Sequence, residues 1–300
     1  MGFSNERMRT GQLVNWFLLD GLELTPAGYP VTQALSLPFG VDHLIGFNEL
    51  LTCKHPENAG VHFFLDDYQF ERFWRMPERY LYALEKCPLV IGPDFSLYTD
   101  FPAPIQHWNH YRNQLLTAWL QHNGVCTIPT ASWSDEDSFR WCFDGISKGG
   151  AVAVSTVGCL VHKDALQGLL RGVAELIRQT EPEELLVYHG GFLSPQKKRL
   201  VTLIAHAASE TMKIRFWADI DTGGFRMFRH LQELIPSLTP MRMSGKFVDS
   251  FHEHGLARSE AYLSSLRIDV ENGKYPLFRD AIERILNYGV TIEQETFLNE

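Results

Sequence analysis

The stretch AVAVSTVGCLVHKDALQGLLRGVAELIRQTEPEELLVY, residues 151–188, decides the fold class. Its first residues, Ala151–Val154, are apolar and rich in valine, which is typical of a buried strand. Asp164 can cap a helix over Ala165–Arg178, where apolar residues recur at helical spacing on one face. Leu185–Tyr188 is a second short apolar run. This order of strand, helix and strand predicts two parallel strands joined by a crossover helix.

The same alternation extends in both directions from this unit, beginning near Gly60. Successive strands start roughly 25 to 36 residues apart, which is the length of one βαβ unit. The other expected strands are Val61–Leu65, Leu89–Ile91, Val125–Ile128, Ile214–Trp217 and Leu238–Met243. The sequence therefore predicts an α/β protein of repeated βα units with a mainly parallel sheet, either doubly wound or curled toward a barrel. After Met243 the pattern is helical to the end.

Three regions follow from this pattern. Residues 1–59 contain several prolines and glycines and are expected to form an irregular lead-in. Residues 60–190 form the βα-repeat domain, and residues 191–300 form a C-terminal region. Because no Gly/Ser-rich linker separates the last two, we expect one continuous sheet from Gly60 to Met243.

The composition indicates an ordinary globular protein of the cytoplasm. Of the 300 residues, 45% are hydrophobic and 21% charged. The five cysteines form no CxxC pair and are expected to be reduced. The first apolar stretch, Leu13–Leu19, is interrupted by Asn15 and followed by Asp20, so no signal peptide is expected. No apolar run is long enough to span a membrane, and the sequence indicates no oligomeric state.

The charge distribution bears on nucleic-acid binding. The net charge of −9 argues against wholesale capture of nucleic acid. Between Gly191 and Lys246, however, nine basic residues stand against four acidic ones. Such a local excess is a modest footprint for a phosphate backbone, and a solvated surface explains it about as well.

The clearest polar motif is Asp219-Ile220-Asp221, which follows an expected strand and precedes Gly223-Gly224 and a helix. In an extended chain Asp219 and Asp221 face the same side, and two adjacent carboxylates repel unless a cation lies between them. Mg²⁺ prefers carboxylate oxygens, so the pair predicts a divalent metal site. The alternative is that one aspartate caps the helix and the other is solvated.

Polar residues also follow the strands of the first half. Parallel strands end at one edge of a sheet, where α/β proteins bind ligands. Strand ends are also where any chain turns polar, so this pattern has a structural alternative. The candidate ligand-binding residues are Asp66, Asp67, Asp94, Ser96, Ser155 and Thr156.

A histidine pair gives a weaker signal. His107 and His110 lie three residues apart on an expected helix, where they could share a ligand or be structural. The sequence contains no GxxxxGKS, GxSxG or HExxH motif, so P-loop, hydrolase and zincin chemistry lack support.

The first part of the chain, from about His62 to Tyr188, resembles an uncharacterised bacterial and phage family known as a domain of unknown function. This resemblance implies no activity. The runs that carry it are HFFLDDYQFE at 62–71, GPDFSLY at 92–98, WNHYRN at 108–113, CFDGI at 142–146 and STVG at 155–158.

The second part, from about Leu186, resembles the C-terminal Toprim-like domain of the nuclease subunit of Wadjet anti-plasmid systems. That domain is related to the DNA-cleaving subunit of archaeal-type topoisomerases. The carrying runs are VYHGGF at 187–192, SP at 194–195, FWADIDTGGF at 216–225, Met243 and IEQE at 292–295. The resemblance implies that Asp219 and Asp221 bind Mg²⁺ or Mn²⁺, and it adds Glu293 and Glu295 as catalytic residues.

This sequence departs from the Toprim pattern in one respect. A Toprim site also uses a glutamate at the end of an earlier strand, and no strand before Leu186 clearly ends in Glu. One hypothesis is therefore a weak, metal-dependent DNA-cleaving or nicking enzyme of phage or plasmid defence. The other is a noncatalytic protein that binds a ligand or a protein partner. In the first hypothesis the residues that contact DNA are Lys197, Lys198, Arg199 and Arg226.

Overall fold

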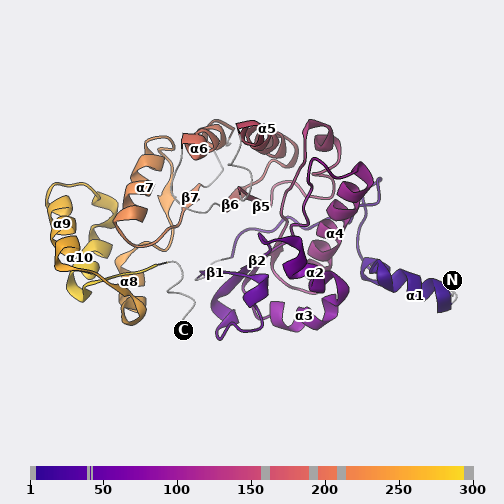
Figure 1. The fold of residues 1–300 in the computed structure, drawn as a ribbon, viewed down its shortest axis with the longest axis horizontal. Coiled ribbons are helices and arrows are strands. Elements are labelled where there is room, and N and C mark those ends of the chain that lie inside the picture. The colour runs from indigo at the N-terminus through magenta and orange to yellow at the C-terminus, as the bar shows by residue number, and fades with distance from the viewer. Residues whose placement is uncertain are drawn as a thin grey trace. The chain divides into compact units, whose positions relative to one another are not determined.

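The computed structural model describes residues 5–38, 41, 43–156, 163–188, 195–207 and 214–293 (Figure 1). The chain divides into two compact units. Unit 1 comprises Met1–Gly190 and Ala207–Met212, and unit 2 comprises Gly191–His206 and Lys213–Glu300. Helices and parallel strands alternate through most of the chain, which confirms the predicted α/β class.

Unit 1 is built on parallel strands in sequential order. The strands β1 to β4 pair in the order β1-β2-β3-β4, and each pair is parallel. A parallel bridge from Thr130 to Ala153 links the chain after β4 to β5, which pairs with β6 along five residues. The bounds are β1 His43–Gly46, β2 Ala59–His62, β3 Leu89–Ile91, β4 Thr127–Ile128, β5 Ala151–Ser155 and β6 Glu184–Tyr188.

Two cores lie on opposite faces of these strands because successive side chains point to opposite sides. Val61 and Val90 join the core formed with the helices. Leu89 and Ile91 face a second core, together with residues of β4, β5 and β6. A core shared by strands of the whole series, in sequential order, favours the barrel-like alternative for unit 1. The helices of unit 1 are α1 Asn5–Leu13, α2 Asp67–Arg75, α3 Pro77–Leu84, α4 Ala103–His122 and α5 Lys163–Thr180.

The expected lead-in contains structure that the sequence did not predict. β1 lies within residues 1–59 and is the first strand of the sheet. It is four residues long and ends in a glycine, so periodicity could not detect it. Thr32, also within residues 1–59, is joined to a later part of unit 1, because its backbone N–H donates to the Gly145 carbonyl at 2.8 Å.

Unit 2 combines a short parallel strand pair with helices. β7 pairs with β8 in parallel, and β9 pairs with β10 antiparallel. The β9–β10 pair corrects the prediction that the chain is helical throughout after Met243, although α8, α9 and α10 do lie there. The bounds are α6 Pro195–Ala207, β7 Arg215–Phe216, α7 Thr222–Gln232, β8 Thr239–Pro240, α8 Gly245–Phe251, β9 Leu256–Ala257, α9 Glu260–Glu271, α10 Arg279–Tyr288 and β10 Val290–Thr291.

The aromatic residues of α7 are part of the hydrophobic core of unit 2. Phe225 and Phe228 are buried and contact Phe278 with ring centroids 4.7 and 5.0 Å apart. Within the described ranges, no strand pairing joins β6 to β7, and the expected continuity of the sheet across Gly190 stays a prediction. In the same ranges no helix has the length and apolar character needed to cross a bilayer.

Candidate functional site

The two aspartates of the predicted metal site lie in the turn between β7 and α7. Asp221 is the N-cap of α7, and its Oδ1 accepts a hydrogen bond from the Gly224 backbone N–H at 2.8 Å. Position 224 requires glycine, because a Cβ there would lie 2.0 Å from the Asp219 carbonyl oxygen. Ile220 is buried between the two partly exposed aspartates, as expected for an extended chain.

An antiparallel bridge brings the C-terminal part of the chain to this turn. The Ile220 N–H donates to the Ile292 carbonyl at 2.7 Å. Glu293 thereby comes to share a cation with Asp221: the Nη2 atom of Arg258 lies 3.7 Å from Asp221 Oδ2 and 3.8 Å from Glu293 Oε1. The fourth predicted catalytic residue, Glu295, lies outside the described residues.

The chemistry of this acidic cluster suits a cation. Carboxylate oxygens are ligands that Mg²⁺ and Mn²⁺ prefer. The Arg258 guanidinium places a positive charge within 4 Å of the carboxylates of Asp221 and Glu293. In the part of the chain that the structure describes, no three acidic, cysteine or histidine side chains are arranged to enclose a metal. Metal binding by Asp219 and Asp221 therefore stays a prediction.

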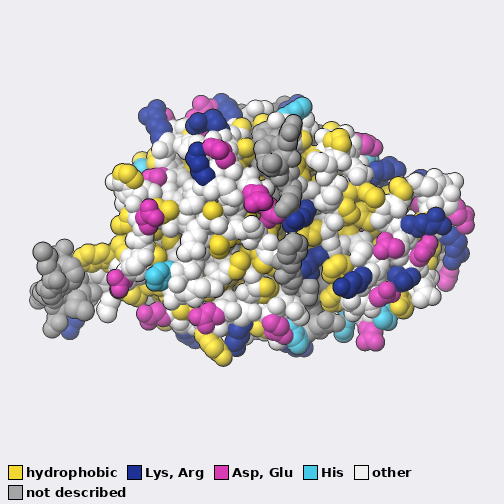
Figure 2. All heavy atoms as spheres, turned by 180° about the vertical axis from the view of Figure 1, so that it is seen from behind, with side chains coloured by type: hydrophobic (Ala, Val, Ile, Leu, Met, Phe, Trp, Pro, Cys, Tyr) yellow, Lys and Arg dark blue, Asp and Glu magenta, His cyan; other side chains and the backbone are white. Residues whose placement is uncertain are grey.

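The basic residues predicted to contact DNA lie on two helices of unit 2. Lys198 and Arg199 are exposed on α6, and Arg226 is exposed on α7. The side chain of Lys197 lies outside what the structure describes. On the face shown in Figure 2, lysine and arginine side chains are interspersed with acidic ones and form no single basic patch.

In unit 1, hydroxyl and carboxyl groups meet at the carboxyl ends of the strands. The Asp67 carboxylate accepts hydrogen bonds from the Ser96 backbone N–H, at 3.2 Å, and from the Ser96 hydroxyl, at 2.8 Å. The Ser132 hydroxyl donates to Asp94 Oδ1. Residues that follow β2, β3 and β4 thus form two pairs, Asp67 with Ser96 and Asp94 with Ser132. Asp67 and Asp94 are two of the three aspartates predicted at this edge.

The environment of Asp94 is unusual for a carboxyl group. Burial raises the pKa of Asp94 to about 6, the hydrogen bond from Ser132 opposes this rise, and the nearby charge of Asp67 adds to it. Carboxyl groups with raised pKa values often occur at functional sites, but structural networks produce them too. Asp94 is therefore a carboxyl group whose protonation changes near pH 6.

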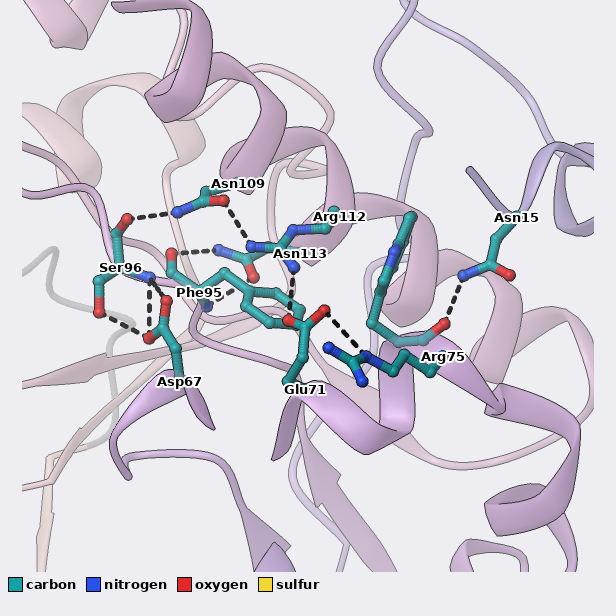
Figure 3. A network of polar contacts seen from close by, with 10 residues as sticks. Asn15, Asp67, Glu71, Arg75, Phe95, Ser96, Asn109, Arg112 and Asn113 are labelled. Carbon is teal, nitrogen blue, oxygen red and sulfur yellow. Dashed lines mark hydrogen bonds and ion pairs between the residues drawn. The ribbon is translucent and has the colours of Figure 1, made fainter. Parts of the chain in front are cut away.

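Polar side chains of α4 hold the loop that carries Ser96 (Figure 3). Asn113 Oδ1 accepts from the Phe95 N–H at 2.8 Å, and Asn113 Nδ2 donates to the Phe95 carbonyl at 3.1 Å. Asn109 Nδ2 donates to the Ser96 carbonyl at 2.7 Å. The same motif contains Arg112, which donates to Glu71 at 2.8 Å and to Asn109 Oδ1 at 2.6 Å. Much of the WNHYRN run thus positions the strand-end loop.

The remaining ligand-binding candidates are placed as follows. Asp66 is exposed at the N-cap of α2 and makes no side-chain capping bond. Ser155 is the last residue of β5, opposite Tyr188 of β6. Thr156 is buried, and its N–H donates to the Tyr188 carbonyl at 2.9 Å. Thr156 therefore extends the pairing of β5 with β6.

His107 and His110 of α4 have separate hydrogen-bond partners. His110 Nε2 lies 2.9 Å from the Asp144 carbonyl, and His107 Nδ1 lies 2.5 Å from the Tyr29 hydroxyl. Burial lowers the pKa of His110 to about 4. This arrangement favours the structural alternative for the pair over a shared ligand.

Two family models match the chain, one for each of the two resemblances. A family model described as a domain of unknown function, DUF4417, matches residues 34–206. The chain belongs to this family. A second model, described as the C-terminal part of the Wadjet protein JetD, matches residues 174–299. Both resemblances predicted from the sequence are confirmed. Residues 174–206 are common to the two matches and contain β6 and most of α6.

Two curated relatives of this DUF4417 chain are phage proteins. The Gene 1 protein of Mycobacterium phage L5 is 44% identical over 133 residues, which is 44% of the chain and 58% of that relative. The Gene 1 protein of Mycobacterium phage D29 is 42% identical over 141 residues, which is 45% of the chain and 52% of that relative. The matches thus span little more than half of these relatives. No solved structure matches.

Sequence reasoning missed three residues of the two sites in this DUF4417 chain. Arg258 and Ser132 reach their carboxylate partners through the tertiary fold, 37 and 38 positions along the chain. Arg112 was assigned no role beyond its family motif. A local charge pattern contains no signal for any of these contacts.

Proposed function

We propose that unit 2 is a Toprim-like module that nicks DNA slowly with a divalent metal, Mg²⁺ or Mn²⁺. The observation that carries this proposal is the approach of Glu293 to Asp221 around the Ile220–Ile292 bridge. It brings a carboxylate from the opposite end of the matched region to Arg258, which also lies within 4 Å of Asp221. The similarity of residues 174–299 to the C-terminal part of JetD supports a nuclease-like role.

Each residue has a part in the proposed reaction. Asp219 and Asp221 would hold the ion, which when bound would stabilise negative charge on the phosphate oxygens. The basic residues of α6 and α7 would hold the DNA backbone and give no sequence preference. Because exposed lysine and arginine act through charge, we expect DNA binding to weaken steeply as salt is added.

The rate of this reaction should be low. β5 and β6 end in Ser155 and Tyr188, so neither supplies the glutamate that a Toprim site carries after an earlier strand. Loss of general acid–base help typically lowers a rate by about 10² to 10⁴. The excess of acidic residues before Gly191 also gives that part of the chain a negative charge, which does not attract the DNA phosphates.

The similarity to a Wadjet protein and the two phage relatives suggest a setting. A role in defence against plasmids or phages, in a complex with other proteins, is the biological part of the proposal. DNA is the proposed substrate, and a protein partner would bring it to the acidic cluster.

The test is nicking of supercoiled plasmid by the full chain with Mn²⁺, Mg²⁺ or EDTA. We expect slow relaxation with Mn²⁺, none with EDTA, and none for the double variant Asp219→Asn, Asp221→Asn. The exposed Glu283→Gln on α10 is the matched control and should nick like the unmodified chain. Equal nicking by the double variant would contradict the proposal.

A second candidate function is ligand binding by unit 1 without catalysis. It is favoured by the two carboxyl–hydroxyl pairs at the strand ends and by the raised pKa of Asp94. In this case the plasmid would remain intact under all conditions. Asp94→Asn would then alter the binding of small molecules recovered with the purified protein, while Asp221→Asn would leave it unchanged.

A further inference from the structure

Arg242 has an uncommon backbone conformation just after β8. Its φ of +56° lies in the left-handed region, which residues other than glycine, asparagine and aspartate rarely adopt. The residues on both sides fix the chain there, because the Met241 N–H donates to the Phe216 carbonyl at 2.8 Å and Met243 is buried in the core of unit 2. Such a conformation persists only where its surroundings impose it, and it occurs often at functional sites.

The guanidinium of Arg242 is held beside two aromatic side chains. Its central carbon lies 5.9 Å from the centre of the Trp217 ring and 5.6 Å from that of the Phe247 ring. A cation at this distance is attracted to the electrons of a ring face. All three residues are half-buried, so part of their surface remains in contact with water. The charge therefore has a defined position, and the side chain has less freedom to lose when it binds a ligand.

Arg242 lies at the same edge of the sheet as the turn between β7 and α7. β7 and β8 are parallel neighbours, with Phe216 opposite Pro240, so both strands end at one edge. The turn with Asp219 and Asp221 follows β7, and Arg242 follows β8. Parallel α/β sheets bind their ligands at the edge formed by the carboxyl ends of the strands. The guanidinium is thus a fixed positive charge at the edge where nicking is proposed.

We infer that Arg242 binds a phosphate of the DNA backbone at the carboxyl edge of β7 and β8. The inference rests on the proposed function and adds a DNA contact that the fold holds in position, in contrast to exposed Lys198 and Arg226. The planar fork of a guanidinium matches two oxygens of a phosphate. The two aspartates of the neighbouring turn repel a phosphate, and Arg242 supplies the opposite charge at the same edge.

A purely structural role for Arg242 makes a different prediction. Its contacts with Trp217 and Phe247 would then serve only to fix the segment between β8 and α8. Removing the guanidinium would lower the melting temperature and leave the affinity for DNA unchanged. Asparagine adopts the left-handed conformation more readily than most residues, so Arg242→Asn removes the charge and keeps the backbone. The affinity of this variant for DNA therefore separates the two roles.

The experiment measures binding of the full chain to a short fluorescent DNA duplex by anisotropy, in EDTA and over a series of NaCl concentrations. For Arg242→Asn we expect about tenfold weaker binding, as for the loss of a charge-assisted contact. The slope of log affinity against log salt should also become shallower by about 0.9, because one phosphate contact is lost. Arg242→Lys keeps the charge and should keep the slope.

Arg229→Asn is the matched control. Arg229 also lies over an aromatic ring of unit 2, with its guanidinium carbon 5.9 Å from the centre of the Tyr275 ring. It belongs to the last turn of α7, which leads to the start of β8 and so to the opposite edge of the sheet. We expect Arg229→Asn to bind DNA like the unmodified chain.

The outcomes distinguish this inference from the proposed function. Unchanged DNA affinity in Arg242→Asn, or an equal loss in Arg229→Asn, would overturn the inference and leave metal-dependent nicking in place. The expected loss in Arg242→Asn, combined with a chain that nicks no plasmid, would support the DNA contact and contradict the nicking. If the unmodified chain binds no DNA, both fail. If Arg242→Asn does not fold, Arg242→Gly provides the same comparison, because glycine also adopts a positive φ.

Discussion

The guanidinium carbon of Arg112 lies 3.6 Å from the centre of the Phe95 ring, so the charge stacks on an aromatic face inside unit 1 (Figure 3). Phe95 is fully buried, and the side chain of Arg112 is 10% exposed. The charge is balanced by Glu71 at 2.8 Å. Stacking on a ring while one nitrogen donates to Glu71 and another to Asn109 requires a planar guanidinium, which lysine lacks.

We predict that Arg112→Ala lowers the free energy of unfolding by about 2–3 kcal/mol, because it removes the stacking and the buried partner of Glu71. Arg112→Lys should recover only part of this loss. Urea denaturation measures both effects. The control is Arg75→Ala, because Arg75 lies 3.8 Å from the same Glu71 but is exposed, and such pairs contribute about 0–1 kcal/mol. Equal losses at positions 75 and 112 would contradict the prediction.

A second prediction concerns Asp94 and pH. Its folded-state pKa of about 6 lies above the ordinary value of 3.8, so the folded protein binds this proton more tightly than the unfolded chain. The resulting stabilisation is complete below about pH 4 and is lost as the pH rises through 6. Relative to the unmodified chain, Asp94→Asn should therefore gain stability between pH 4 and 6. Parallel stability curves for the two proteins would show that Asp94 does not titrate in this range.

Two buried histidines have the opposite effect on acid stability. Burial lowers the pKa of both His62 and His110 to about 4, from an ordinary 6.5. The unfolded chain binds protons more readily there, so stability is lost as the pH falls from 6.5 toward 4. His110→Gln should flatten this part of the curve measured by denaturant unfolding. The unprotonated Nδ1 of His62, which accepts from the Phe64 N–H at 3.2 Å, fits a neutral imidazole.

The double role of Asp221 allows capping and metal binding to be separated. Asparagine caps helices about as well as aspartate, whereas alanine at an N-cap costs about 1 kcal/mol. In EDTA, Asp221→Asn should therefore melt close to the unmodified chain and Asp221→Ala several degrees lower. In Mn²⁺, both variants should lose most of the stabilisation that the metal gives. If Asp221→Asn keeps that stabilisation, the metal lies elsewhere.

Much of the architecture could be predicted from the sequence because it depends on local patterns. β3 has the predicted bounds, and β5 and β6 differ from the prediction by one residue each. β1 escaped because its sequence, HLIG, contains a histidine and a glycine, which interrupt the apolar run that identifies β3. The prediction that Asp219 and Asp221 share one side depended on alternation and agrees with burial of Ile220. The position of Arg258 depends on a pairing of Ile220 with Ile292, which no local pattern contains.

The pairing of β6 with β5 affects how the chain can be cut for study. The match to JetD begins at residue 174, before β6, but all five residues of β6 pair with β5 of unit 1. Tyr188 at its end also contacts Phe64, with ring centroids 5.0 Å apart. A truncation at the family boundary would therefore remove β6 from unit 1 and expose the Ala151–Ser155 edge to aggregation. When the two halves are produced separately, β6 should stay with the N-terminal half.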